Sequence, residues 1–212
     1  MKNYKSIFIL LFGVLFTNIL LAQDVEPPDW RTNGLPGLTF QIWEFEMDIN
    51  PAPPTYQSNV YGSSSCDVYS GEFTNNLPNP DSGNPTPVSG WYFPTEDNAL
   101  VLTVPNDPAE RDSKIIRIQI TSSKAPADTS VGTTPPATLI SNTYNMSWQH
   151  STAPWYTYVK DYLIQPNPDS ETIAINFPAN TIVEEVVIDT WCLPEANVIF
   201  LVYLICYFLR RK

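Results

Sequence analysis

The chain has 212 residues and a formal net charge of −11 at pH 7, with 21 prolines, eight glycines, three cysteines and one histidine. Such an acidic protein repels phosphate backbones and anionic lipid surfaces, which excludes nucleic acid as a partner. A single histidine excludes a His-rich zinc site, and the few glycines form no phosphate-binding loop.

The first 22 residues have the pattern of a secretory signal peptide. Lys2 and Lys5 give a positive start, residues 6–21 are mostly apolar, and Ala22 places a small residue before Gln23. We expect a signal helix that is cleaved between Ala22 and Gln23. The alternative is an N-terminal membrane anchor that is retained, and the chain is exported in either case.

Residues 23–191 are expected to form one domain, because a segment of this length can bury a single hydrophobic core. Residues 23–195 contain six Lys and Arg and all 22 Asp and Glu, so this segment has a formal charge of −16. This charge favours divalent cations over phosphates as partners.

Short runs of β-branched and aromatic residues, separated by proline and polar turn residues, predict an all-β fold. Leu100, Leu102 and Val104 alternate with more polar neighbours, which is the period of a strand with one buried face. Strands are expected at 39–47, 56–61, 89–93, 99–104, 114–121, 137–148, 155–165, 171–177 and 181–191.

The turn-forming residues 166–170 predict a hairpin between 159–165 and 171–177. Residues 77–87 and 125–136 are rich in turn formers and are expected to be long surface loops. Short strands separated by such turns are typical of an antiparallel β-sandwich with a jelly-roll-like topology.

Two cysteines, Cys66 and Cys192, lie in the exported part, whereas Cys206 lies in the apolar tail. An oxidising compartment permits a disulfide between Cys66 and Cys192. The alternative is two unpaired thiols that pack as small apolar side chains.

Glu44, Glu46 and Asp48 alternate along the expected strand 39–47, which places three carboxylates on one face and Trp43 and Phe45 on the other. Three like charges in a row repel unless a cation lies among them, so this face is a candidate calcium site. The alternative is a solvated acidic face. Trp43 is expected to be buried.

A second acidic group, Glu184, Glu185 and Asp189, fits a metal site, a glycosidase carboxylate pair or the outer face of a strand, and we favour the outer face. The single histidine, His150, has no Gly-x-Ser-x-Gly motif beside it and is expected to be an exposed structural residue. The sequence therefore predicts a protein that is not an enzyme.

Aromatic residues are plentiful for so small a domain. Exposed Trp91, Trp155, Tyr156 and Tyr158 would suit stacking against sugar rings, so they are candidates for carbohydrate binding. The alternative is that most of them belong to the core, as aromatic residues in sandwiches commonly do.

The chain ends in residues 192–212 with Pro-Glu-Ala, an apolar run and three basic residues. The expected transmembrane segment, 197–209, contains twelve consecutive apolar residues, which span about 18 Å as a helix against a bilayer core of about 30 Å. So short a span suits a temporary anchor whose basic end stays in the cytoplasm. The expected sorting signal consists of Pro194, Glu195, Ala196, Arg210, Arg211 and Lys212.

These features resemble the bacterial PEP-CTERM proteins, which carry a C-terminal sorting signal read by an exosortase. The likeness rests on residues 28–31 with 39–45, on residues 167–173 running into 186–190, and on the tail. The family's Pro-Glu-Pro is Pro-Glu-Ala in this chain. The resemblance implies processing near Pro194-Glu195 by an exosortase-like enzyme, loss of the tail, and release to the cell surface or an exopolysaccharide matrix.

Two functions remain open. The first, which we favour, is a non-catalytic exported protein of the surface or exopolysaccharide matrix. The second is a secreted carbohydrate-binding module or, with a carboxylate pair, a glycoside hydrolase. A groove lined by two or more aromatic side chains would favour the second, and a smooth acidic sandwich would favour the first.

Overall fold

A computed structural model of the chain describes residues 27–33, 35–77, 88–95, 98–109, 111–124, 130–149 and 154–193. These residues form antiparallel strands and one short 3-10 helix, η1 (Asp29–Asn33), which confirms the all-β prediction. The leader, the tail and His150 lie outside the described residues. Within the described ranges, no helix is long and apolar enough to cross a membrane.

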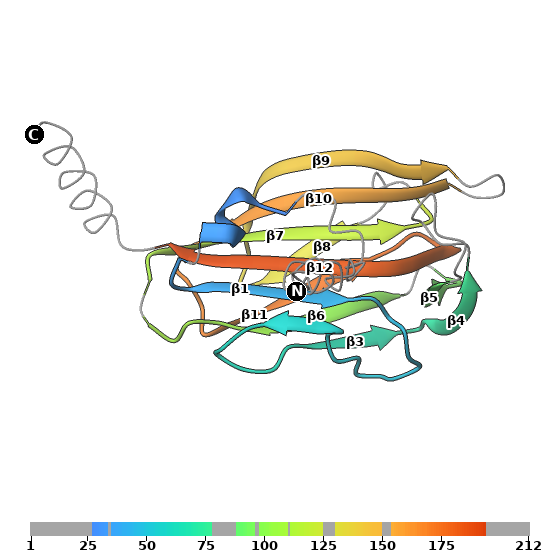
Figure 1. Cartoon of the computed structure of the whole chain (residues 1–212), viewed down its shortest axis with the longest axis horizontal. Helices are drawn as coiled ribbons and strands as arrows, with labels where there is room; N and C mark the ends of the chain where they lie inside the picture. Colours follow the sequence, from blue (N-terminus) through green and yellow to red (C-terminus); the bar gives the residue numbers. More distant parts are fainter. Residues whose placement is uncertain are drawn as a thin grey trace, which may run out of the picture.

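The described strands form two sheets that share one core. Sheet A contains, in spatial order, β2 (Tyr56–Ser58), β1 (Leu38–Trp43), β12 (Thr181–Leu193), β7 (Ser113–Ser122), β10 (Pro154–Ile164) and β9 (Thr138–Gln149). Two further strands of this sheet lie off that path: β5 (Val88–Phe93) pairs with β12, and β4 (Glu72–Leu77) pairs with β5. Sheet B contains β3 (Ser65–Tyr69), β6 (Ala99–Pro105), β11 (Ser170–Asn176) and β8 (Ser130–Thr134). Figure 1 shows the long strands β9, β10, β7, β12 and β1 side by side in one layer.

The chain passes back and forth between the two sheets: β6, β8 and β11 of sheet B each follow and precede strands of sheet A. The predicted hairpin between residues 159–165 and 171–177 is therefore wrong. The turn residues 166–170 are present, but they carry the chain from β10 in sheet A to β11 in sheet B. This architecture is consistent with the expected β-sandwich.

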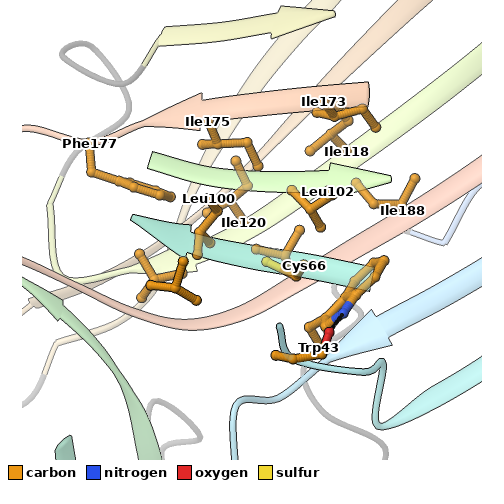
Figure 2. Close-up of a cluster of buried hydrophobic side chains, with 14 of the residues drawn as sticks. Trp43, Cys66, Leu100, Leu102, Ile118, Ile120, Ile173, Ile175, Phe177 and Ile188 are labelled. Atoms are coloured by element: carbon orange, nitrogen blue, oxygen red, sulfur yellow. Dashed lines mark hydrogen bonds between the residues drawn. The ribbon is translucent and has the colours of Figure 1, made fainter. Parts of the chain in front are cut away.

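The core lies between the sheets, where inward-facing side chains alternate along each strand. In β6, Leu100, Leu102 and Val104 are buried, and the residues between them are partly exposed. Figure 2 shows Leu100 and Leu102 clustered with isoleucines of β7 and β11, so both sheets contribute to one core. The period of two seen in the sequence is thus the signature of these faces.

Some elements differ from the expectation. Strands β3, β4 and β8 were not predicted, and β8 replaces part of the loop expected at 125–136. Strands β4 and β8 are short and rich in Ser, Thr, Gly and Asn, so they show no apolar alternation. In β3 the alternation is limited to Cys66 and Val68, which is too short to stand out in the sequence. At the other end, β12 extends to Leu193, so the domain boundary placed at residue 191 falls inside a strand.

Candidate functional site

The acidic residues proposed for calcium do not lie on one strand face. Strand β1 ends at Trp43, and Phe45 follows with a φ of 48°, a left-handed conformation that breaks the extended backbone. Glu46 and Asp48 are exposed and Glu44 is partly exposed. In the part of the chain that the structure describes, no three His, Cys, Asp or Glu side chains are positioned to hold a metal ion.

The aromatic residues proposed for sugar stacking are mostly inside. Trp91, Trp155 and Tyr158 are buried, and Tyr156 is partly exposed. Three of the four candidates are therefore unable to present a ring face to a ligand. Trp43 is buried as predicted, and its indole nitrogen donates a hydrogen bond to the Ala52 carbonyl, 3.2 Å away.

Both cysteines of the described residues are free and buried, so the disulfide left open by the sequence does not form. Cys66 lies on β3 in the core near Trp43 (Figure 2), where burial raises the pKa of its thiol. Cys192 lies on β12 directly opposite Lys114 of β7. Burial raises the pKa of the Cys192 thiol, and the Lys114 ammonium opposes that rise.

A buried polar cluster joins the two sheets beside Cys192. Lys114 of β7 directs its ammonium Nζ to Glu171 of β11, at 2.8 Å from both carboxylate oxygens. Asn106, the first residue after β6, donates from Nδ2 to Glu171 Oε2 and to the Pro168 carbonyl, the latter at 2.9 Å. The exposed fractions of Lys114 and Glu171 are 0%, and that of Asn106 is 3%.

Burial opposes both charges of this cluster. It lowers the pKa of Lys114 and raises the pKa of Glu171, while the attraction between the two groups acts in the opposite direction on each. Removing an ion pair from water favours its neutral forms, so the proton shared by the pair is held less firmly on the amine than in solution.

The loops around the cluster are tied together by further polar contacts. Asp107 accepts hydrogen bonds from the Ala109 amide at 3.0 Å and from Arg111 Nη2 at 3.2 Å. The Asn167 Oδ1 accepts a contact from the Cys192 thiol at 3.5 Å. These contacts fix the segment that carries Asn106 against the end of the sandwich.

A second set of buried acids lies toward the opposite end of β12. Glu184 and Glu185 occupy a bulge where the pairing of β12 with β7 shifts register. Both are buried, so the prediction that they lie on the outer face of a strand is wrong. Burial, together with the nearby Glu44 carboxylate, raises the pKa of Glu184 to about 8. Burial and the charges of Glu184 and Glu44 raise the pKa of Glu185 well above its usual range.

Asp189 is separate from those acids and belongs to a row of charges on the outer face of sheet A. Arg31 of η1 forms a bidentate ion pair with Asp189, in which Nε and Nη2 each donate to one carboxylate oxygen. On neighbouring strands, Arg117 binds Asp161 through two hydrogen bonds of 2.7 and 2.9 Å. The Arg31 guanidinium also lies 3.9 Å from the centre of the Phe40 ring, so η1 is fixed by a charge and by a cation–π contact.

Beside this ion pair is a groove of about 330 Å³ at the edge formed by η1, β1 and β2. Its aromatic rings pack against one another or against neighbouring rings. The centres of the Phe40 and Tyr56 rings are 5.6 Å apart, and those of Trp30 and Trp191 are 6.1 Å apart. The groove is lined by Trp30, Arg31, Leu38, Thr39, Phe40, Tyr56 and Ser58.

Sequence reasoning missed the groove and the Lys114 cluster. The groove is assembled from three segments whose aromatic residues show no common spacing. The cluster could have been found from strand alternation. Lys114 points to the same face of its strand as Ile116, Ile118 and Ile120, and Glu171 points to the same face as Ile173. A charged residue at an inward position on each of two strands indicates a buried pair.

Comparison with protein-family models, with curated proteins and with solved structures finds no match for this chain.

Proposed function

We propose that this chain is an exported, non-catalytic protein of the cell surface or exopolysaccharide matrix, built as a jelly-roll-like sandwich. The leader of residues 1–22 directs export, and the tail is a temporary membrane anchor. The resemblance of the tail to PEP-CTERM signals supports processing by an exosortase-like enzyme at Pro194-Glu195.

One observation carries this proposal: the last described strand, β12, is held in the sheet up to Leu193, directly before the Pro194-Glu195 signal. Strand β12 pairs with β1, β5 and β7 and is buried along most of its length, and its last residue is Leu193. Cleavage immediately after that residue removes nothing that pairs within the described sheets. A removable tail needs such a junction, because cutting inside a central strand would open the core.

The experiment replaces Pro194 and Glu195 by alanine in the full chain and follows export and processing by intact mass. We expect the wild-type protein to lose its tail and the variant to keep it and remain in the membrane fraction. The matched control replaces Pro53 and Glu46, which are exposed on the folded domain, by alanine. This control should be processed normally. An unchanged mature mass for the Pro194-Glu195 variant would contradict the proposal.

The groove between η1, β1 and β2 meets the condition stated above for the second function, since more than two aromatic side chains line it, and it therefore favours saccharide binding as a second candidate function. Three aromatic side chains line it, and Tyr56 is 50% exposed, so its ring is available for stacking against the apolar face of a sugar. The Ser58 hydroxyl and the Arg31–Asp189 pair place polar groups beside the rings, which suits hydroxyl-rich ligands.

Saccharide binding is tested with Tyr56→Ala and a matched control, Tyr69→Ala. Tyr69 is 54% exposed on β3 of the other sheet and does not line the groove. On a glycan array followed by calorimetry, loss of the Tyr56 ring should weaken binding by about 1 kcal/mol, or roughly fivefold. Equal binding by the wild-type and Tyr56 variant proteins, or no binding by either, would exclude this function for the groove.

A further inference from the structure

The geometry points to a covalent cross-link in the buried polar cluster: an isopeptide bond between the Lys114 amine and the Asn106 carboxamide, formed with Glu171 as the proton-transferring residue. Lys114 Nζ lies 2.8 Å from Glu171 Oε2, and Asn106 Nδ2 donates to that same oxygen. The nucleophile and the group that it attacks are thus held on one carboxylate. This inference is independent of the proposed function.

The fold brings the three side chains together from separate strands. Asn106 directly follows β6, Lys114 is the second residue of β7, and Glu171 is the second residue of β11. Asn106 is also fixed by its backbone amide, which donates to the Asp169 carbonyl at 3.0 Å. The site therefore lies between the sheets, shielded from the water that would otherwise solvate the lysine ammonium.

The reaction needs a neutral amine, and the surroundings favour one. Burial lowers the pKa of Lys114 and raises the pKa of Glu171, so transfer of the lysine proton to the carboxylate leaves an amine beside a carboxylic acid. The charged groups nearest the pair are Asp107 and Arg111, which bind each other, and the neutral thiol of Cys192 on β12 lies opposite Lys114.

The Asn106 carboxamide is fixed by two hydrogen bonds. Its Nδ2 is held by Glu171 Oε2 and by the Pro168 carbonyl, which places the leaving nitrogen against the acid. Within the described residues, its Oδ1 has no hydrogen-bond partner. The carbonyl is therefore not committed to another donor, and the Glu171 carboxyl contacts the amide through its Nδ2.

The step balances without an oxidant or a cofactor. The Lys114 Nζ lone pair forms a bond to Asn106 Cγ, and Glu171 takes a proton from Nζ while its own proton goes to Nδ2. The Cγ–Nδ2 bond then breaks and ammonia leaves, so Glu171 ends as the carboxylic acid that it became when it took the first lysine proton. The product is a secondary amide that ties the end of β6 in sheet B to the start of β7 in sheet A.

The test is tryptic mapping of the full chain after purification and denaturation. Trypsin cuts after Arg111 and Arg117, so without a cross-link Asn106 and Lys114 fall in different peptides. We expect the peptide ending at Arg111 to remain joined to residues 112–117, uncut at Lys114, and lighter than the sum of the two by one ammonia molecule. Cleavage at Lys160 in the same digest reports that digestion is complete.

The peptide map decides, rather than the intact mass, because a chain cut before Gln23 also loses ammonia when an N-terminal glutamine cyclises. Glu171→Gln keeps the size of the side chain and removes its acid, so this variant should give separate peptides with normal cleavage at Lys114. Separate peptides from freshly folded and from aged wild-type protein would overturn the cross-link. Equal cross-linking in Glu171→Gln would overturn the role of Glu171, and should that variant not fold, the wild-type map alone decides.

Discussion

Glu184 is the clearest case of a side chain whose charge state the fold controls. Burial beside Glu44 raises its pKa from 4.5 to about 8, so the folded protein binds a proton that the unfolded chain releases. The folded state is therefore stabilised below pH 4.5, and this contribution is lost as the pH rises through 8. The expected slope is about 1.4 kcal/mol per pH unit for one proton.

Glu185 adds to the effect in the same direction, since its pKa is also raised. We expect the double variant Glu184→Gln with Glu185→Gln to have a free energy of unfolding that falls less between pH 5 and pH 8 than that of the wild type. Urea titrations at both values measure the difference. Glu46→Gln, an exposed carboxylate near the end of β1, is the control and should retain the wild-type slope.

Gly90 lies so close to β12 that it has no room for a side chain. A Cβ atom at this position would be 2.4 Å from the Val183 carbonyl oxygen, at the bulge that precedes the buried acids. Gly90→Ala must push β5 away from β12, which should cost about 1–3 kcal/mol.

The control for Gly90→Ala is Gly132→Ala, because a Cβ atom on Gly132 of β8 would meet nothing within 4 Å. Thermal unfolding should show a lowered midpoint for the Gly90 variant and an unchanged or slightly raised one for the Gly132 variant. Equal midpoints would mean that β5 and β12 are not in close contact.

At the scale of single elements, the two faces of β6 differ sharply. Leu102 is fully buried between the sheets, whereas Val101 on the opposite face is partly exposed. Leu102→Ala should destabilise the fold by about 2–5 kcal/mol through lost packing and the cavity that remains.

Val101→Ala removes a side chain from the same strand and should cost less than about 1 kcal/mol. Chemical denaturation of both variants measures the contrast. Similar losses for the two would indicate that β6 is not packed through the face that carries Leu102.

The sequence predicted the long strands because apolar alternation is a local property, visible in Leu100–Val104 and in Ile173–Phe177. It did not predict which sheet each strand joins, since the turn residues at 166–170 suit a hairpin and a crossing equally well. The end of β1 was also hidden, because only the positive φ of Phe45 separates a strand from the turn that follows.

The candidate sites were harder to predict, because they depend on contacts between distant residues. Lys114 and Glu171 are 57 residues apart, and Arg31 and Asp189 are 158 apart. Their strand parity places Lys114 and Glu171 inside, but nothing in the sequence pairs them. The abundance of aromatic residues suggests sugar stacking at side chains such as Trp155, which is buried, whereas the exposed ring of the groove is Tyr56. The segment η1, which completes the groove, has no recognisable sequence pattern.

For the whole molecule, the decisive boundary is the end of β12. The Cys192 amide donates to the Gly37 carbonyl at 3.1 Å, and Leu193 pairs with Ser113, so both residues still hold the sheet together. A chain that ends at Leu193 should therefore unfold at the same temperature as the full chain.

A chain shortened by two further residues, ending at Trp191, should be less stable by about 2 kcal/mol, because it loses those backbone hydrogen bonds and uncovers Lys114. For a protein of this size that difference lowers the thermal midpoint by roughly 4–8 °C. Calorimetry of the two truncations beside the full chain measures it. A loss of stability already at Leu193 would mean that the tail is part of the folded body and is not a removable anchor.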